Sequence, residues 1–233
     1  MKRIAIITAR GGSKRIPRKN IKKFCGKPIL AYSIEAALQS GEFDVVMVST
    51  DDEEIAGLAK EYGAEVPFYR SEATANDFAT TNDVLREVLS EYEKRGQHFD
   101  IGVCIYPTAP FVTAEKLQRA VGELEESHAD ALIPVVQFSY PPQRALVMEE
   151  GGMIFKYPEY LDSRSQDLEP HYHDAGQFYA FRTEAFRVNG KLMVGNLLPL
   201  VVSEMEVQDI DNQTDWEIAE IKYRLMTEKQ EKE

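Results

Sequence analysis

The chain has 233 residues, 43% of them hydrophobic and 28% charged, which fits one large α/β domain with a sizeable core. Its formal net charge of −12 argues against a general nucleic-acid binder, because such proteins present a basic field. No export signal and no membrane-length apolar run stands out, so we expect no membrane association. Two cysteines without disulfide or metal-ligand spacing favour a reducing, cytoplasmic setting.

Apolar runs and amphipathic stretches alternate along the first 136 residues. Short β-branched runs predict buried strands at 4–8, 45–49, 101–106 and 131–136. Helices are predicted at about 28–39, from residue 50 to about 63, through 84–92 and through 117–124. The first helix would use Leu30, Ile34 and Leu38 as its apolar stripe, and Thr50 and Glu53 are spaced as a capping box for the second. This rhythm predicts a doubly wound, mostly parallel sheet.

The rhythm changes after residue 137. Apolar runs at 146–148 and 153–155 flank a Glu-Gly-Gly turn and predict a hairpin. We treat 137–175 as an inserted hairpin and loop arm in a single domain of 1–233, because so long a polar stretch is usually functional or part of an interface. The later elements are strands at 177–181 and 198–202, a closing helix after Thr214 with Trp216, Ile218, Ile221 and Leu225 as its apolar side chains, and a tail that should fray from Thr227.

Positive charge is concentrated at the N-terminus. Residues 1–27 hold ten Lys or Arg and no acid, whereas the rest of the chain carries a net charge of −22. Gly11 and Gly12 follow the first strand, where they would let backbone N–H groups approach a phosphate closely. The spacing matches neither a Walker A motif nor a dinucleotide fingerprint, and a solvated basic turn is the alternative. The side chains that could neutralise a triphosphate are Arg10, Lys14 and Lys19.

Four segments, 9–20, 48–51, 107–110 and 209–211, carry a resemblance to a known family. Over nearly the whole chain, the sequence resembles the acylneuraminate cytidylyltransferases, also called CMP-sialic acid synthetases. Residues 164–179 are most similar to the branch that activates pseudaminic acid, a 5,7-diacylamido nonulosonic acid. The resemblance implies a Rossmann-like nucleotidyltransferase fold, CTP and a nonulosonic acid as substrates, Mg²⁺ as cofactor, and a homodimer in which the arm helps to close the partner's sugar pocket.

The resemblance also implies site residues for the nucleotide. Those that match the family's CTP contacts are Ala9, Arg10, Gly11, Gly12, Ser13, Lys14, Asn20, Arg70, Asp77 and Thr81. Of these, Arg70, Asp77 and Thr81 would lie near cytosine and ribose, in the loop after the third strand, although ordinary surface-loop chemistry is the alternative. The catalytic candidates are Arg10, Lys14, Lys19 and Asp211.

The sugar is expected over the later strands. A bidentate Arg suits its carboxylate, although a single Arg is more often a surface charge. The candidate contacts are Tyr106, Arg144, Arg164, His173, Gln177 and Tyr179. Tyr106 stands where many relatives have Gln, and His173-Asp174 replaces an Arg-Pro-type pair, which disfavours N-acetylneuraminate. We expect His98, His128 and His171 at the surface, and Phe178 and Cys104 in the core.

Asp209 and Asp211 lie two residues apart. In an extended segment their carboxylates share a face, and two hard oxygen ligands plus substrate phosphates are what Mg²⁺ prefers. The alternative is a turn with solvated acids. The resemblance implies the metal role for this pair. Asp51, at the end of the second strand, is either a site residue or the N-cap of the next helix.

The implied reaction is attack of the sugar's anomeric C2 hydroxyl on the α-phosphate of CTP, with pyrophosphate as the leaving group. Positioning and charge stabilisation dominate such transfers, so the loop cations would stabilise the leaving group and one of the two aspartates would take the proton. N-acetylneuraminate, legionaminate and Kdo stay open as alternative substrates. More distant alternatives are a glycosyltransferase that consumes a nucleotide sugar and a non-catalytic nucleotide-binding module.

Overall fold

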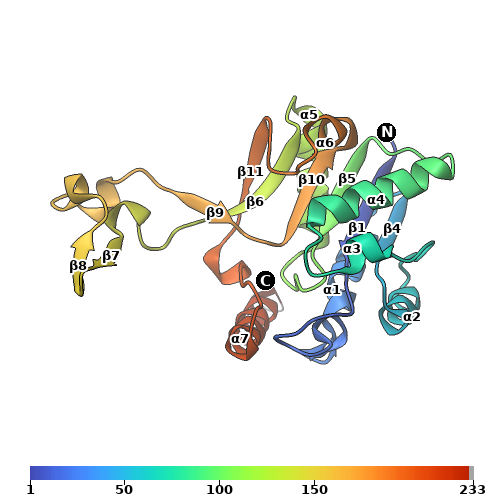
Figure 1. Ribbon diagram of the computed structural model, residues 1–233, viewed down its shortest axis with the longest axis horizontal. Coiled ribbons are helices and arrows are strands. Elements are labelled where there is room, and N and C mark those ends of the chain that lie inside the picture. The colour runs from blue at the N-terminus through green and yellow to red at the C-terminus, as the bar shows by residue number, and fades with distance from the viewer. Residues whose placement is uncertain (231–233) are drawn as a thin grey trace.

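A computed structural model describes residues 1–230 and shows a seven-stranded central sheet (Figure 1). Six strands follow one another in the order β11-β6-β10-β5-β1-β4, and β9 pairs with β6. Their bounds are β1 Arg3–Thr8, β4 Val45–Ser49, β5 Ile101–Ile105, β6 Ala131–Gln137, β9 Tyr172–Asp174, β10 Phe178–Arg182 and β11 Leu197–Val201. The six strands predicted from the apolar runs are therefore confirmed, each within one residue at either end.

Five of the seven strands of the sheet point the same way. β1 pairs in parallel with β4 and β5, and β11 pairs in parallel with β6. β10 runs antiparallel to β5 and β6, and β9 runs antiparallel to β6. The predicted doubly wound, mostly parallel sheet is confirmed. The two antiparallel strands were not predicted, because a fully buried strand shows the same apolar run in either direction.

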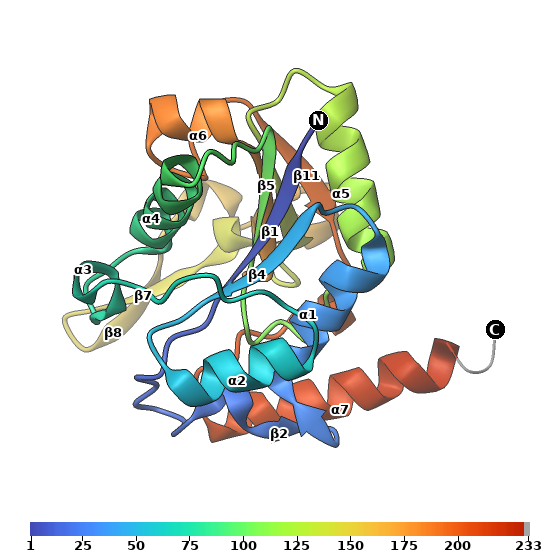
Figure 2. The same cartoon turned by 90° about the vertical axis from the view of Figure 1, so that its right-hand side faces the viewer.

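Helices cover both faces of the sheet (Figure 2). Between β1 and β11 the chain forms six helices: α1 Ile29–Ser40, α2 Glu53–Glu61, α3 Glu72–Ala75, α4 Thr81–Lys94, α5 Ala114–Glu126 and α6 Thr183–Asn189. Apolar side chains of α1, α2 and α5, such as Ile34 and Leu117, pack on one face, and those of α4 and α6, such as Leu85, pack on the other. Each fully buried Leu or Ile contributes about 1.5–3 kcal/mol, so these layers fix the strand ends that carry the loops.

A third apolar cluster joins the two ends of the chain. After β1 the chain forms a 3-10 turn, η1 Lys19–Ile21, and a small hairpin of β2 Lys23–Phe24 and β3 Lys27–Pro28. The last helix, α7 Gln213–Gln230, lies beside β2 (Figure 2). The rings of Phe24 and Trp216 are buried, with centroids 5.5 Å apart. This contact brings the loop after β1 and the segment before α7 to the same end of the sheet.

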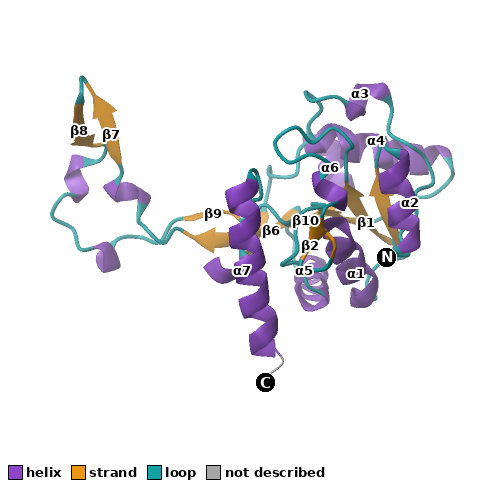
Figure 3. Ribbon diagram, turned by 90° about the horizontal axis from the view of Figure 1, so that it is seen from below, coloured by secondary structure: helices purple, strands orange, loops and turns teal. Residues whose placement is uncertain are grey.

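The arm, residues 137–175, projects away from the sheet (Figures 1 and 3). Its base is the pairing of β6 with β9, in which Gln137 lies opposite Tyr172. At its far end β7 Leu146–Glu149 and β8 Gly152–Phe155 form the predicted hairpin. Short 3-10 turns, η2 Pro142–Arg144, η3 Pro158–Tyr160 and η4 Ser165–Asp167, complete it. Large apolar side chains stand exposed on the hairpin: Leu146, Met148, Met153 and Ile154.

Predictions for the start of α2 and for Leu38 were wrong. The N-cap of α2 is Asp52, whose Oδ1 accepts from the N–H of Ile55 at 3.0 Å. The Thr50 hydroxyl is buried and accepts from the N–H of Asp52 instead of capping the helix. The side chains of Leu30 and Ile34 are buried in the core as predicted. Leu38, near the C-terminal end of α1, is 43% exposed and does not belong to that core.

The predicted face of the closing helix was also wrong. Trp216 is buried, but Ile218, Ile221 and Leu225 are each at least 39% exposed. The helix docks through Trp216 and Ala219 on the N-terminal hairpin, which leaves the longer apolar stripe toward solvent. α7 continues to Gln230, past the point where fraying was predicted, and 231–233 lie outside the described residues. Within residues 1–230 no helix is both long and apolar enough to cross a bilayer.

Candidate active site

The loop that follows β1, residues 9–18, is fixed by contacts to the chain after β4. The N–H of Gly11 donates to Oδ1 of Asp51 at 3.1 Å, and a Cβ at position 11 would lie 2.7 Å from Oδ2 of Asp52, so glycine is required there. Arg18 has a left-handed backbone, φ 54°, which costs about 1–3 kcal/mol for a non-glycine residue. Its guanidinium donates to both Asp52 oxygens at 2.5 and 3.0 Å, which holds the strained turn. Of the two roles considered for Asp51, the N-cap of α2 is wrong, because Asp52 is the N-cap. Asp51 instead contacts the loop after β1.

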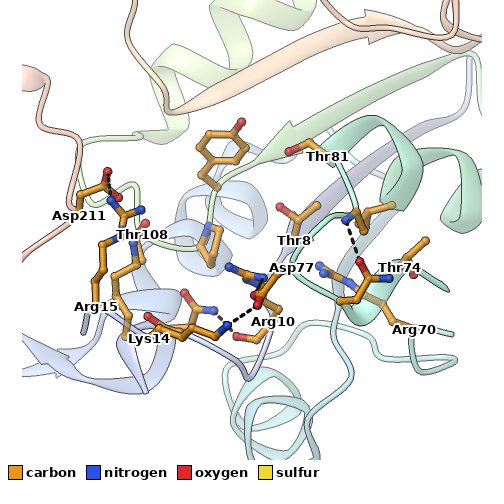
Figure 4. A pocket seen from close by; sticks show the side chains of 18 of the residues that line it. Thr8, Arg10, Lys14, Arg15, Arg70, Thr74, Asp77, Thr81, Thr108 and Asp211 are labelled. Atoms are coloured by element: carbon orange, nitrogen blue, oxygen red, sulfur yellow. Dashed lines mark hydrogen bonds and ion pairs between the residues drawn. The ribbon is translucent and has the colours of Figure 1, made fainter. Parts of the chain in front are cut away.

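The loop cations converge on one space and bind carboxylates there (Figure 4). Arg10 donates to Oδ1 of Asp77 at 2.7 Å, and Lys14 donates to Oδ2 of the same carboxylate at 2.5 Å. These hydrogen bonds, from Lys14 first and then Arg10, lower the pKa of Asp77. Arg15 donates to Oδ2 of Asp211 at 2.6 Å. A single carboxylate therefore already lies between two of the cations predicted to bind a triphosphate.

Lys19 connects the loop to the C-terminal acids. Its ammonium donates to the carbonyl of Ile210 at 2.6 Å, between Asp209 and Asp211. Burial lowers the pKa of Lys19, while the charges of the two aspartates oppose that shift. Asn20 is buried and its amide donates to the carbonyl of Arg10 at 2.8 Å, which fixes the start of the loop against its end. These contacts hold the loop in shape.

Asp209 and Asp211 lie on an extended segment before α7, as their spacing predicted. Ile210 between them is buried in the third apolar cluster, so both carboxylates face the cleft. Desolvation in the cleft, and then the charge of Asp211, raise the pKa of Asp209, with Lys19 acting in the opposite direction. The backbone N–H of Asp211 donates to the carboxylate of Asp215 at 2.9 Å, which ties the segment to the first turn of α7.

The acid pair fits a hard divalent cation. Two carboxylates share one cleft, and the raised pKa of Asp209 shows that added positive charge would be stabilising there. Among residues 1–230 no group of three or more His, Cys, Asp or Glu side chains is placed to hold a metal. Mg²⁺ is commonly held by one or two carboxylates together with waters and substrate phosphates, and the two acids in this cleft suit that ion.

A first cavity of about 640 Å³ opens between the loop, the segment before α4 and the acid pair (Figure 4). It brings together most of the predicted nucleotide, catalytic and metal residues: Arg10, Ser13, Lys14, Lys19, Asn20, Arg70, Asp77, Thr81, Asp209 and Asp211. Further lining residues that sequence reasoning missed are Thr8, Arg15, Thr74, Asn76 and Thr108. Thr8 at the end of β1 and Thr108 after β5 follow strand ends, the one signal that could have indicated them.

Arg70 and Asp77 come from the segment between β4 and α4, and Thr81 is the first residue of α4, so none of them lies in a loop after the third strand as predicted. The chain returns along β4 after its end: the N–H of Arg70 donates to the carbonyl of Thr50 at 3.0 Å. The Arg70 guanidinium donates to Oγ and the carbonyl of Ser49, and burial lowers its pKa to about 10. These contacts hold Arg70 in the cavity wall.

A second cavity of about 500 Å³ lies beside the first, and Tyr106 and Asp209 line both. Two more predicted sugar residues, His173 and Tyr179, line it. The remaining lining residues were not predicted as contacts: Val136, Asp174, Ala175, Gly176, Glu204, Val207, Gln208 and Lys222. Two adjoining cavities with shared walls provide space for two ligands side by side, with Tyr106 and Asp209 at the junction.

Tyr179 is fixed at the wall of the second cavity. Its hydroxyl donates to Oδ2 of Asp174 at 2.5 Å, while Oδ1 accepts from the N–H of Gly176 at 2.8 Å. Its ring meets that of Tyr106 edge to face, with centroids 5.6 Å apart. Burial raises the pKa of both phenols, so they stay neutral and act only through hydrogen bonds and ring contacts.

Several predicted residues do not line either cavity of the described chain. Gln177 is buried behind the second cavity and donates to the carbonyl of Glu206. Arg144 and Arg164 lie in the arm, where Arg164 donates to Asp167 at 2.7 Å. Ala9 is buried, and Gly11 and Gly12 contribute backbone away from the lining, so they shape the loop. His98, His128 and His171 are exposed, and Phe178 and Cys104 are in the core, as expected.

A basic loop after the first strand of a mostly parallel sheet, facing a carboxylate pair across a cleft, defines an α/β nucleotidyltransferase. The family model of the cytidylyltransferases matches residues 4–219, and the chain belongs to this family.

The relatives include enzymes that act on sugar acids. The chain is 40% identical to a pseudaminic acid cytidylyltransferase of Campylobacter jejuni over 97% of both chains. It is 33% identical to a CMP-N,N'-diacetyllegionaminic acid synthase of Legionella pneumophila, covering 94% of this chain and 95% of that one. Among solved structures, CMP:2-keto-3-deoxy-manno-octonic acid synthetase complexed with CTP shares the fold, with a TM-score of 0.72 at 18% identity over 98% of this chain and all of that one. The resemblance to the CMP-sialic acid synthetase family is confirmed.

Proposed function

We propose that the protein transfers CMP from CTP to pseudaminate, giving CMP-pseudaminate and pyrophosphate. The observation that carries this proposal is the 40% identity, over 97% of both chains, to a relative named for this activity. The two adjoining cavities support it, because a nucleotide and a nine-carbon sugar acid need neighbouring sites that meet at one reacting bond. Because CTP is the donor, we place the reaction in the cytoplasm.

In the proposed reaction CTP occupies the first cavity. Loop backbone N–H groups and the side chains of Arg10, Lys14 and Lys19 hold the phosphates, and Arg70 and Thr81 lie on the side of the base and ribose. Asp77, which accepts from Arg10 and Lys14, is the CTP-cavity residue next to the phosphates. The anomeric C2 oxygen bonds to the α-phosphorus, and the bond from this phosphorus to the pyrophosphate oxygen breaks. Lys19 and the loop cations stabilise the charge that develops on pyrophosphate, and the hydroxyl proton passes to the Asp209–Asp211 pair.

Asp209 and Asp211 would hold Mg²⁺. A cation bound there would supply Lewis-acid polarisation of the phosphate and a lower pKa for the attacking hydroxyl. Lys19, which donates to Ile210 between the two acids, orients the pair toward the loop.

The sugar would bind in the second cavity, with Tyr106 at the junction and His173 and Tyr179 on its wall. We propose a single domain whose arm packs against a second copy in a homodimer and brings Arg144 and Arg164 to the partner's sugar. The exposed apolar hairpin supports this role.

The test is pyrophosphate release from CTP and Mg²⁺ with pseudaminate, legionaminate, N-acetylneuraminate and Kdo offered separately. We expect release with pseudaminate. Legionaminate is the second candidate, because the Legionella pneumophila relative is 33% identical. Release with another acid alone would overturn the choice of sugar and keep the reaction. Binding of CTP with no release from any acid would refute the transferase activity.

A further inference from the structure

The second cavity has one Lys or Arg among the described residues that line it, Lys222 on α7. Its ammonium donates to the carbonyl of Val207 at 2.7 Å and to that of Glu204 at 3.1 Å. An ammonium has three N–H donors, so two are used by the protein and the third has no partner among the hydrogen bonds of the described chain. Lys222 is half-buried and makes no ion pair of 4 Å or less within the described chain.

The position of Lys222 is limited by the chain it binds. Val207 precedes Asp209 by two residues, and two residues span at most about 7 Å. The ammonium therefore lies beside the segment that presents Asp209 to both cavities. In a 2-keto sugar acid the carboxylate is attached directly to C2, which bears the attacking hydroxyl. A sugar whose C2 hydroxyl faces Asp209 must place its carboxylate within a few ångströms of the same segment.

The charge of the cavity makes this ammonium important. Three acidic residues, Asp174, Glu204 and Asp209, are among those that line the cavity, and an anionic sugar entering next to them is repelled. Burying a carboxylate without a cation or hydrogen-bond donors is strongly unfavourable. Within this cavity of the described chain, Lys222 is the side chain with a permanent positive charge to offset that cost.

We propose that Lys222 binds the C1 carboxylate of the sugar acid with its third N–H, while the other two hold the segment that leads to Asp209. This inference rests on the proposed function and adds a substrate-binding residue from the chain's own last helix. It orients the sugar as well: the carboxylate points to α7, and the hydroxyl and acylamido groups, which donate hydrogen bonds, point to the Asp174 side of the cavity.

The test compares K222Q with wild type, using pseudaminate and its C1 methyl ester. We expect K222Q to raise the KM for pseudaminate by roughly ten- to hundredfold, as for loss of a charged hydrogen bond, with the KM for CTP unchanged. The ester should inhibit wild type weakly, and K222Q should bind ester and acid almost equally, because the contact is already lost. K222R should recover part of the affinity. R224Q removes an exposed cation from the same helix outside both cavities and should change neither constant.

A different pattern would overturn the inference. If K222Q lowers kcat with an unchanged sugar KM, or if ester and acid still differ in K222Q as they do in wild type, then Lys222 only holds the 204–207 segment in place. Failure of wild type to release pyrophosphate with any sugar acid is a separate result that refutes the proposed function. If another acid is the substrate, that acid and its ester take the place of pseudaminate.

Discussion

Asp77 accepts a hydrogen bond from Arg10 at 2.7 Å, although the two residues are 67 positions apart in the sequence. Lys14 holds the other oxygen of the same carboxylate, so the protein's own anion lies between two cations that the proposed reaction needs for phosphate. A triphosphate that binds there must take these cations over from Asp77.

We therefore expect Asp77→Asn to tighten the binding of tripolyphosphate, an anion that lacks base and ribose, by a few-fold. The effect should fade at high salt, because the pair is exposed. Isothermal calorimetry measures this affinity. Glu61→Gln, which neutralises an exposed carboxylate outside both cavities, is the control. Weaker tripolyphosphate binding in the Asp77 variant would show that Asp77 supports the loop and does not compete with phosphate.

Lys19→Ala should lower kcat by roughly a hundredfold or more while the KM for CTP changes little. The half-buried ammonium lies against Ile210 between the acids, where it would meet charge that develops on the leaving group. Steady-state kinetics with varied CTP provides the measurement. Lys23→Ala removes an exposed cation of the same segment and should be neutral. A rise in KM alone would mean that Lys19 binds only ground-state nucleotide.

Asp209→Asn and Asp211→Asn should each abolish most turnover and weaken divalent cation binding. Each removes one of the two carboxylates that we propose would hold the cation. Electron paramagnetic resonance titration with Mn²⁺ in the presence of CTP reports the binding apart from activity. Asp162→Asn, an exposed acid of the arm, is the matched control. Unchanged Mn²⁺ affinity in both variants would refute the metal role.

Arg18→Met should destabilise the fold by about 1 kcal/mol at neutral pH, after discounting for the solvent exposure of the pair. The hydrogen bond from Arg18 lowers the pKa of Asp52 from 3.8 to about 2. A lowered carboxyl pKa contributes stability that is present above pH 3.8 and is lost as the pH falls toward 2. Urea unfolding of both proteins from pH 7 to 3 should therefore show a difference that narrows below pH 4. A constant difference would assign the effect to packing.

Met148→Asp should dissociate the proposed homodimer. Met148 is 77% exposed and lies opposite Met153 in the arm hairpin, so a charge there would oppose burial against a second copy. Sedimentation velocity at micromolar concentration measures the change, with Glu150→Gln in the turn as control. The variant should also raise the sugar KM more than the CTP KM. A monomeric wild-type protein under the same conditions would contradict the dimer.

Local sequence patterns predicted the strands and most helices, because buried apolar runs and turn residues are short-range signals. The direction of β10 and the exposed face of α7 depend on long-range packing, which leaves no local pattern. The loop and the acid pair were predictable because strand ends and alternate residues have fixed geometry. Lys222 was missed, because a single Lys on a helix gives the same signal as a solvated charge.

The cleft is assembled from the two ends of the polypeptide: Lys19 contacts Ile210, and Arg15 contacts Asp211, across separations of 191 and 196 residues. During synthesis the basic loop therefore leaves the ribosome long before the acids that face it, and must wait through the translation of nearly the whole chain. A nascent chain that has not yet reached Asp209 has the cations of the basic loop but lacks the carboxylates that complete the cleft. We therefore expect the cleft to be complete only after α7 has been synthesised and has docked on the N-terminal hairpin.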